Sequence, residues 1–223
     1  MTDLQNKALE SSELLKDITP AERESLLLCI SAGITVYGKG NIIWSAGDAV
    51  SRIGLVLSGE VRISMEDMEG RRNVLSVLRP PDLFGEVFAL SGIPSSVTVY
   101  TDTGAEVLYL DARKVSAVCR DACGFHRQLI VNLMGILSRK NVGLNQKIQC
   151  VGQRTTREKV SAFLAMHHTR AGKNPFTVPF NRAEMADYLC VDRSALSLVL
   201  AQMQEEELIT FNKNEFKILG STD

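Results

Sequence analysis

Polar side chains near the C-terminal end of the chain fall at the starts of two predicted helices. Asn181 suits the N-cap of a helix over 182–189, and Asp192 suits the N-cap of a second helix that ends near Glu206. Cys190 lies between them, where only a tight turn fits. On spacing alone, the pattern predicts either a helix-turn-helix or a plain helical hairpin with a solvated polar face.

The start of the second helix carries the side chains that would meet DNA. Arg193, Ser194 and Ser197 can all reach groups in a major groove about 12 Å wide. A close crossing of the two helices needs a small residue, and Ala186 lies at the crossing. The apolar positions that lock the pair together are Met185, Leu189, Val191, Leu196 and Val199.

A hairpin is predicted after these helices. Ile209–Phe211 and Phe216–Leu219 flank the turn-forming residues 212–215, a pattern typical of a two-stranded wing. Lys213 in this turn is interpreted either as a phosphate contact or as a residue that serves surface solubility.

Short β-branched runs fill the chain from Val36 to Leu110, with turn signals roughly every ten residues. These signals are Gly38–Gly40, Ala46–Asp48, Ser58–Gly59, Glu69–Gly70, Pro80–Asp82 and Gly92–Pro94. Strands at that spacing predict a sandwich or a roll. Ahead of them, Thr19, Pro20 and Glu22 form the capping box of a helix.

Between the strands and the C-terminal helices, apolar residues recur with alternating steps of four and three. The positions are Ile130, Met134, Leu137, Asn141, Leu144, Ile148 and Val151, and only Asn141 among them is polar. Such a narrow stripe suits a second helix, and Asn141 at a core position would fix the register of a dimer. The alternative is a solitary amphipathic helix that packs on the roll.

The bulk properties allow two domains in 223 residues and set limits on the partners. No run approaches the roughly 18 apolar residues of a membrane span, and the polar N-terminus with Asp3 and Glu10 does not look like a secretory signal. We therefore expect a cytoplasmic protein without a membrane partner. The net charge of −1 leaves no basic footprint. The five cysteines are widely spread and indicate reduced thiols.

The run Phe180–Ser197 resembles the helix-turn-helix of the CRP/FNR transcriptional regulators. The roll motifs Gly40, Gly47-Asp48, Leu57–Val61 and Phe84–Glu86 occur in the same order as in that family, and the resemblance covers roughly residues 20–219. It implies an α+β protein. The implied parts are a β-roll (a double-stranded β-helix, jelly-roll-like) over 1–124 that senses an effector, a long dimerisation helix over 125–152, and a winged helix-turn-helix over 153–223.

The resemblance also implies roles for single residues. Arg193 would read a guanine through O6 and N7. Asn181 and Arg182, at the start of the preceding helix, would hold phosphate oxygens. The implied partners are a second copy of the chain, double-stranded DNA with a two-fold symmetric operator, and RNA polymerase.

Two positions depart from the family pattern. Leu198 stands where related recognition helices carry a second polar base-reading residue. Cys190 replaces the turn glycine, and because positive φ is unfavourable for a side chain other than glycine, we expect a turn of different shape.

Family members that bind cyclic nucleotides end the loop after Gly-Glu in an arginine. Here Gly85 and Glu86 are present, but the loop ends in Ser95 and Ser96. A serine holds a phosphate weakly compared with a guanidinium, so we do not expect cyclic AMP as the effector, and we interpret Glu86 as structural. A pocket that extends to Leu144 and Asn145 would bind another small molecule or no ligand at all. The other alternative for the signal is a redox change.

Other classes of function find little support. An iron–sulfur cluster needs several cysteines near the N-terminus, where only Cys29 lies. Cys119 and Cys123 are interpreted either as a thiol switch or as two small apolar side chains. Because the roll region has no histidine before His126, neither an enzyme nor a metal site is expected. The remaining alternative is a cyclic-nucleotide-type sensor module that acts on a protein partner, but such a module would lack the second helical unit.

Overall fold

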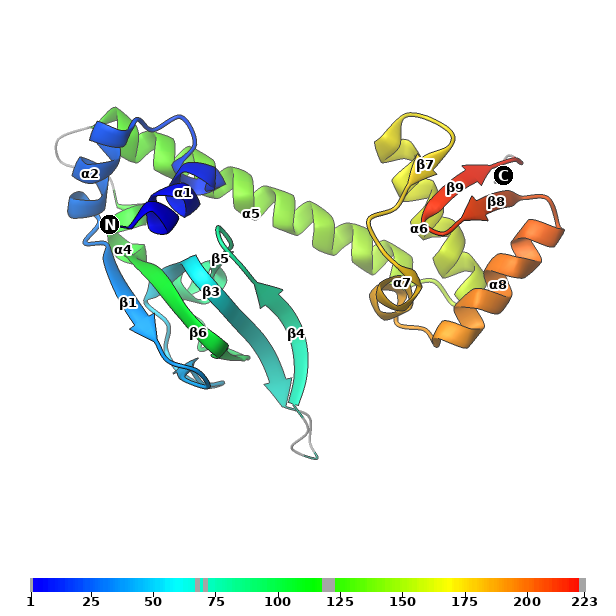
Figure 1. The fold of residues 1–223 in the computed structure, drawn as a ribbon, viewed down its shortest axis with the longest axis horizontal. Coiled ribbons are helices and arrows are strands. Elements are labelled where there is room, and N and C mark those ends of the chain that lie inside the picture. The colour runs from blue at the N-terminus through cyan, green and yellow to red at the C-terminus, as the bar shows by residue number, and fades with distance from the viewer. Residues whose placement is uncertain (1, 67–68, 70–71, 118–122, 221–223) are drawn as a thin grey trace. The chain divides into compact units, whose positions relative to one another are not determined.

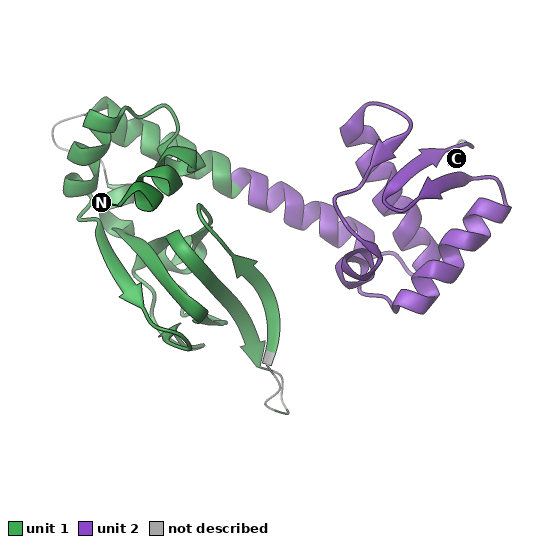
Figure 2. Cartoon of the chain, in the orientation of Figure 1, with its two compact units in different colours: residues 1–137 green, residues 138–223 purple. Residues whose placement is uncertain are grey.

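The computed structural model describes residues 2–66, 69, 72–117 and 123–220. It divides into two compact units, residues 1–137 and residues 138–223 (Figure 2). The long helix α5 (Gly124–Val151) contributes to both units. The bounds 1–124, 125–152 and 153–223 therefore stay a prediction about function, since the helix is no compact unit of its own.

Three helical elements open the first unit: α1 (Asp3–Ser11), the 3-10 helix η1 (Glu13–Leu15) and α2 (Pro20–Cys29). The capping box of α2 is confirmed, because Glu22 accepts the Thr19 N–H at 2.9 Å and the Thr19 hydroxyl accepts the Glu22 N–H at 3.4 Å. Helix α1 is not predicted by the sequence pattern. Most residues of α1 are polar, so its apolar face is short in the sequence. Leu9 on this face is fully buried.

The first unit contains a six-stranded antiparallel sheet (Figure 1). Its central pair is β3 (Arg52–Glu66) and β6 (Thr98–Asp111), and the strand order is β1-β6-β3-β4. Two short strands pair with these long ones, β2 with β6 and β5 with β3. The other strands are β1 (Gly33–Tyr37), β2 (Ile42–Trp44), β4 (Arg72–Leu78) and β5 (Leu83–Phe84). The predicted α+β fold class is confirmed.

The predicted turn at Ser58–Gly59 is wrong, because β3 passes straight through it. The register against β6 shifts on both sides of this point, which marks β-bulges. Gly59 has φ +78°, and a Cβ there would lie 1.9 Å from the carbonyl oxygen of Gly104 on β6. Glycine is therefore required for close approach inside a strand, and not for a chain reversal.

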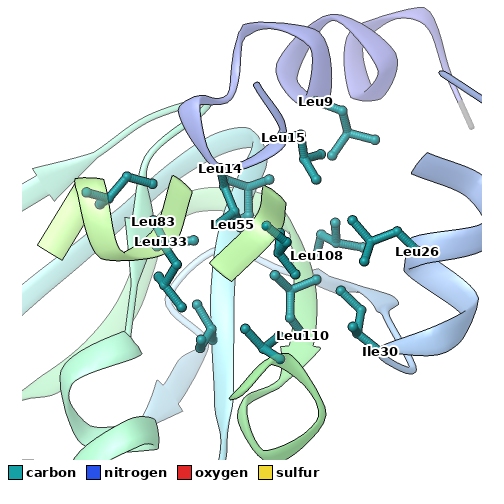
Figure 3. Packing of buried hydrophobic residues seen from close by; sticks show 14 of the residues in the cluster. Leu9, Leu14, Leu15, Leu26, Ile30, Leu55, Leu83, Leu108, Leu110 and Leu133 are labelled. Atoms are coloured by element: carbon teal, nitrogen blue, oxygen red, sulfur yellow. The ribbon is translucent and has the colours of Figure 1, made fainter. Parts of the chain in front are cut away.

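The two faces of the sheet bury different side chains. On one face Leu55 and Leu108 meet leucines of α1, η1 and α2 and Leu133 of α5 (Figure 3). On the other face Val56 and Val107 form the inner core of the roll. Two short helices, α3 (Glu86–Ser91) and α4 (Ala112–Ser116), complete the unit.

The second unit packs three helices against a small sheet. They are α6 (Thr156–Ala171), α7 (Arg182–Leu189) and α8 (Arg193–Glu205), and the strands are β7 (Phe176–Thr177), β8 (Ile209–Asn212) and β9 (Glu215–Ile218) in the order β7-β9-β8. Strand β7 pairs with β9 and so joins the wing hairpin as a third strand. Among the described residues, no helix has the length and apolarity that crossing a bilayer requires.

Candidate nucleic-acid interface

Helix α7 begins at a complete capping box. The side-chain oxygen of Asn181 accepts the N–H groups of Ala183 and Glu184 at 2.9 and 3.0 Å, and Glu184 accepts the Asn181 N–H at 2.8 Å. The acceptor oxygen of Asn181 is thereby occupied. Its amide NH₂ group stays available as a donor, which is the group that a phosphate needs.

The turn after α7 keeps the left-handed conformation that glycine favours. Cys190 adopts φ 51° and ψ 55°, and the Val191 N–H donates to the Ala186 carbonyl at 3.1 Å. The expectation of a differently shaped turn is therefore wrong. The strain at Cys190 is tolerated because Ala186, Leu189 and other buried residues over-determine the helix crossing.

Helix α8 presents a polar surface at its start. Arg193, Ser194, Ser197 and Leu198 are all exposed. The Ser197 hydroxyl donates to the Arg193 carbonyl at 2.9 Å, so toward a base it can only accept. Asp192 occupies the N-cap, but its side chain makes no capping hydrogen bond.

The wing brings further cations to the same place. A groove of about 700 Å³ is lined by Asn181 and Arg182 of the α7 start, Arg193 of α8 and Lys213 of the wing turn. The two-residue turn between β8 and β9 holds Lys213 at φ 53°. Four of the six predicted DNA-binding residues thus meet in one groove, although they are distant in sequence.

Arg182 has a structural role that its sequence position does not predict. Its guanidinium lies 4.7 Å from the ring centroid of Phe211 and 5.1 Å from that of Phe216, both in the wing. Burial against these rings lowers the pKa of Arg182. Arg182 therefore fixes the wing against α7, in addition to any phosphate contact that its N–H edge makes.

An aromatic cluster that the sequence pattern does not predict joins α6 to α7 and to the residue Phe180 before α7. Phe163, Phe180 and Tyr188 pack with ring centroids 5.1 to 5.7 Å apart. In addition, Arg157 of α6 pairs through both guanidinium nitrogens with Glu206 at the end of α8. The only sequence signal for these contacts is the presence of large or charged residues within amphipathic helices.

The predicted effector loop lies in the first unit. Gly85 is left-handed (φ +77°), and a Cβ there would lie 2.8 Å from the Trp44 ring. Glu86 is buried at the start of α3, as a structural role requires. Ser96 is exposed, whereas Leu144 and Asn145 belong to the second unit.

Ser95, at the end of the predicted effector loop, makes hydrogen bonds within the protein. Its side chain is buried, accepts the indole N–H of Trp44 at 3.1 Å and donates to the Val97 carbonyl at 2.7 Å. Its backbone N–H donates to the Asp48 carbonyl at 2.9 Å. The hydroxyl hydrogen is thus used inside the protein and is not available to a phosphate.

The two units match known domains in the expected order. Residues 34–122 match the cyclic nucleotide-binding domain, and residues 158–220 match the Crp-like helix-turn-helix domain. The chain is a member of the CRP/FNR family.

Relatives of this CRP/FNR protein are distant in sequence. The cyclic AMP receptor protein of Thermus thermophilus is 25% identical over 202 residues, which are 90% of this chain and 89% of that protein. The CRP-like cAMP-activated global transcriptional regulator of Mycobacterium tuberculosis is 26% identical over 108 residues, 48% of each chain, so this chain spans about half of that relative. The solved structure of CprK complexed with OCPA has a TM-score of 0.62 at 13% identity, covering 88% of this chain and 90% of that one, which shows the fold alone.

Helix α5 of the CRP/FNR protein carries two apolar stripes. Leu129, Leu133 and Ile136 are buried against the core of the first unit. The other stripe holds the predicted seam, in which Met134, Leu144 and Ile148 are 62, 62 and 63% exposed.

The remaining seam residues differ in their surroundings. Asn141 is exposed, Ile130 and Val151 are half-buried, and Leu137 packs partly against the core of its own unit. A seam residue buried only by a second copy would be exposed in the single chain, and Leu137 does not meet this expectation.

The predicted thiol switch lies partly outside the described residues, because Cys119 is not among them. Cys123 is half-buried, and Cys29 and Cys190 are exposed.

Proposed function

We propose that this CRP/FNR protein regulates transcription by binding double-stranded DNA as a homodimer. The observation that carries the proposal is the groove where Asn181, Arg182, Arg193 and Lys213 converge beside the exposed start of α8. Guanidinium, ammonium and amide donors in one groove suit phosphate oxygens, and α8 has the position from which a helix enters the major groove. The proposed location is the cytoplasm, with RNA polymerase as a further partner.

The proposed dimer predicts the form of the DNA target. A two-fold symmetric protein requires an operator with inverted half-sites about 34 Å apart, one helical turn. Selection of bound duplexes from a random pool, followed by sequencing, is expected to return such inverted repeats. A pool that converges on single half-sites contradicts the dimer, and a pool that does not enrich contradicts sequence-specific binding.

The proposed signal is a small molecule or a redox change. Cyclic AMP is not expected to be the effector. The names of the relatives point to different ligands, cyclic AMP for one and OCPA for another. In this chain the position of the family's phosphate-binding arginine is Ser95, whose hydroxyl hydrogen goes to Val97. Loss of a charged bidentate partner costs about 3 kcal/mol, or roughly 100-fold in affinity.

Calorimetry is therefore expected to show no saturable heat when cyclic AMP is added at physiological concentration. The T. thermophilus cyclic AMP receptor protein serves as a positive control. A dissociation constant in the low micromolar range for this chain would overturn the inference, and would mean that backbone amides and Ser96 replace the arginine.

The alternative, a sensor module that acts on a protein partner, is not favoured. It does not account for a helix-turn-helix and a wing with cations in their common groove.

A further inference from the structure

The first unit contains a pocket whose lining includes no residue of the DNA interface or of the predicted effector loop. Its volume is about 320 Å³, and it lies between strands β1 and β2 and the segment that leads into β3. The aromatic and charged side chains in its wall are those of Tyr37, Trp44, Asp48, Arg52 and Tyr109. Gly85, Ser95 and Ser96 are not part of this wall.

Arg52 places a positive charge at the pocket. Its guanidinium carbon lies 4.5 Å from the ring centroid of Tyr109, so one face of the guanidinium is stacked and its N–H edge is free. Among the residues that the structure describes, no acidic side chain pairs with Arg52. A carboxylate suits this edge because it accepts two parallel hydrogen bonds from a guanidinium.

The two tyrosines supply a neutral donor next to the charge. Their hydroxyl oxygens are 2.8 Å apart, so one hydrogen is shared between them and the other can still be donated. The pKa of Tyr109 is raised, first by burial and second by the hydrogen bond with Tyr37. Tyr109 therefore stays protonated at neutral pH.

An aromatic wall completes the pocket. The Trp44 ring is held by stacking on Phe84, at 5.4 Å between centroids, and by its N–H bond to Ser95 at 3.1 Å. The one acidic group in the wall is Asp48. Its carboxylate accepts the Ser45 N–H at 2.8 Å and thereby stabilises the turn over 45–48. A ring that enters the pocket thus meets a fixed indole.

We propose that this pocket binds a small planar anion, a single aromatic ring that bears one carboxylate. Arg52 would pair with the carboxylate, the free tyrosine hydroxyl would donate to it, and the ring would pack against Trp44. The volume lies at the lower end of ligand pockets, which start at about 300 Å³, and so limits the ligand to one ring.

Benzoate is the probe for the test, with benzyl alcohol as its uncharged counterpart. Calorimetry on the full-length chain is expected to show saturable binding of benzoate and much weaker binding of the alcohol. Trp44 is the only tryptophan of the chain, so its emission reports whether the bound ring lies in this pocket. Because Arg52 is exposed and its charge is screened by solvent, its loss in Arg52→Gln is expected to weaken benzoate binding about tenfold.

Arg127→Gln is the matched control, because it removes an exposed arginine of the same unit that does not line the pocket. It is expected to bind benzoate as the wild type does. Three results would each overturn the proposal: no binding of benzoate, binding without a change in Trp44 emission, or equal affinity in the two variants. Equal binding of benzyl alcohol would also contradict an anion site.

Discussion

A chain with Leu144→Asp and Ile148→Asp is expected to sediment as a monomer at concentrations where the wild type is a dimer. Both side chains are more than 60% exposed in the single chain, so a second copy of α5 is what would bury them. Burial of an aliphatic side chain contributes about 1.5 kcal/mol or more. The dimer would bury Leu144 and Ile148 of both copies, which makes four side chains. Their loss is expected to weaken dimerisation by more than about 10⁴-fold.

The choice of positions follows from the surroundings of the seam. Leu137→Asp would place a charge against the core of its own unit, so it would report on folding as well as on dimerisation. A matched control is Gln146→Asp with Gln149→Asp, which adds the same charge to the same helix away from the seam. This control is expected to stay dimeric. If the wild type itself sediments as a monomer at micromolar concentration, the seam is wrong.

Replacement of Arg193 by alanine is expected to remove discrimination at one base pair of each half-site. Arg193 is exposed on the first turn of α8, from which a guanidinium can bind the O6 and N7 atoms of guanine. The expected cost is about 1–3 kcal/mol per half-site on the selected operator, with non-specific binding little changed. Binding assays on operator and scrambled duplexes at several salt concentrations measure both quantities.

Arg182→Ala provides the contrast. Removal of this charge is expected to weaken binding to every sequence alike and to reduce the salt slope by about one per subunit. Because Arg182 also stacks on Phe211 and Phe216, the same change is expected to lower the thermal stability of the second unit. Arg182→Lys separates the two effects, since it keeps the charge and loses the planar stack.

Equal loss on both duplexes for Arg193→Ala and Arg182→Ala would mean that Arg193 is only a phosphate contact. Leu198, which is exposed on α8, would then mark a helix that relies on DNA shape and on apolar contact with thymine methyl groups.

Local sequence determined where several helices of this protein begin. The capping boxes Thr19–Glu22 and Asn181–Glu184 join residues three positions apart, so the residue types alone predict where these helices begin. The four-three repeat of apolar residues likewise predicts helix α5. The order and spacing of residues in the helix-turn-helix identify the family.

Tertiary structure decided which side chains are free to act. The Ser95 hydroxyl oxygen accepts the indole N–H of Trp44, 51 positions earlier in the chain, and Arg182 stacks on Phe211 in the wing. Gly59 requires glycine because β6 lies against it and because its φ is +78°. Such contacts depend on how strands and helices far apart in sequence pack, and hydrophobic period or capping carries no information about those distances. Sequence therefore predicted the candidate DNA-binding residues, whereas packing decided which atoms of them remain available to a ligand.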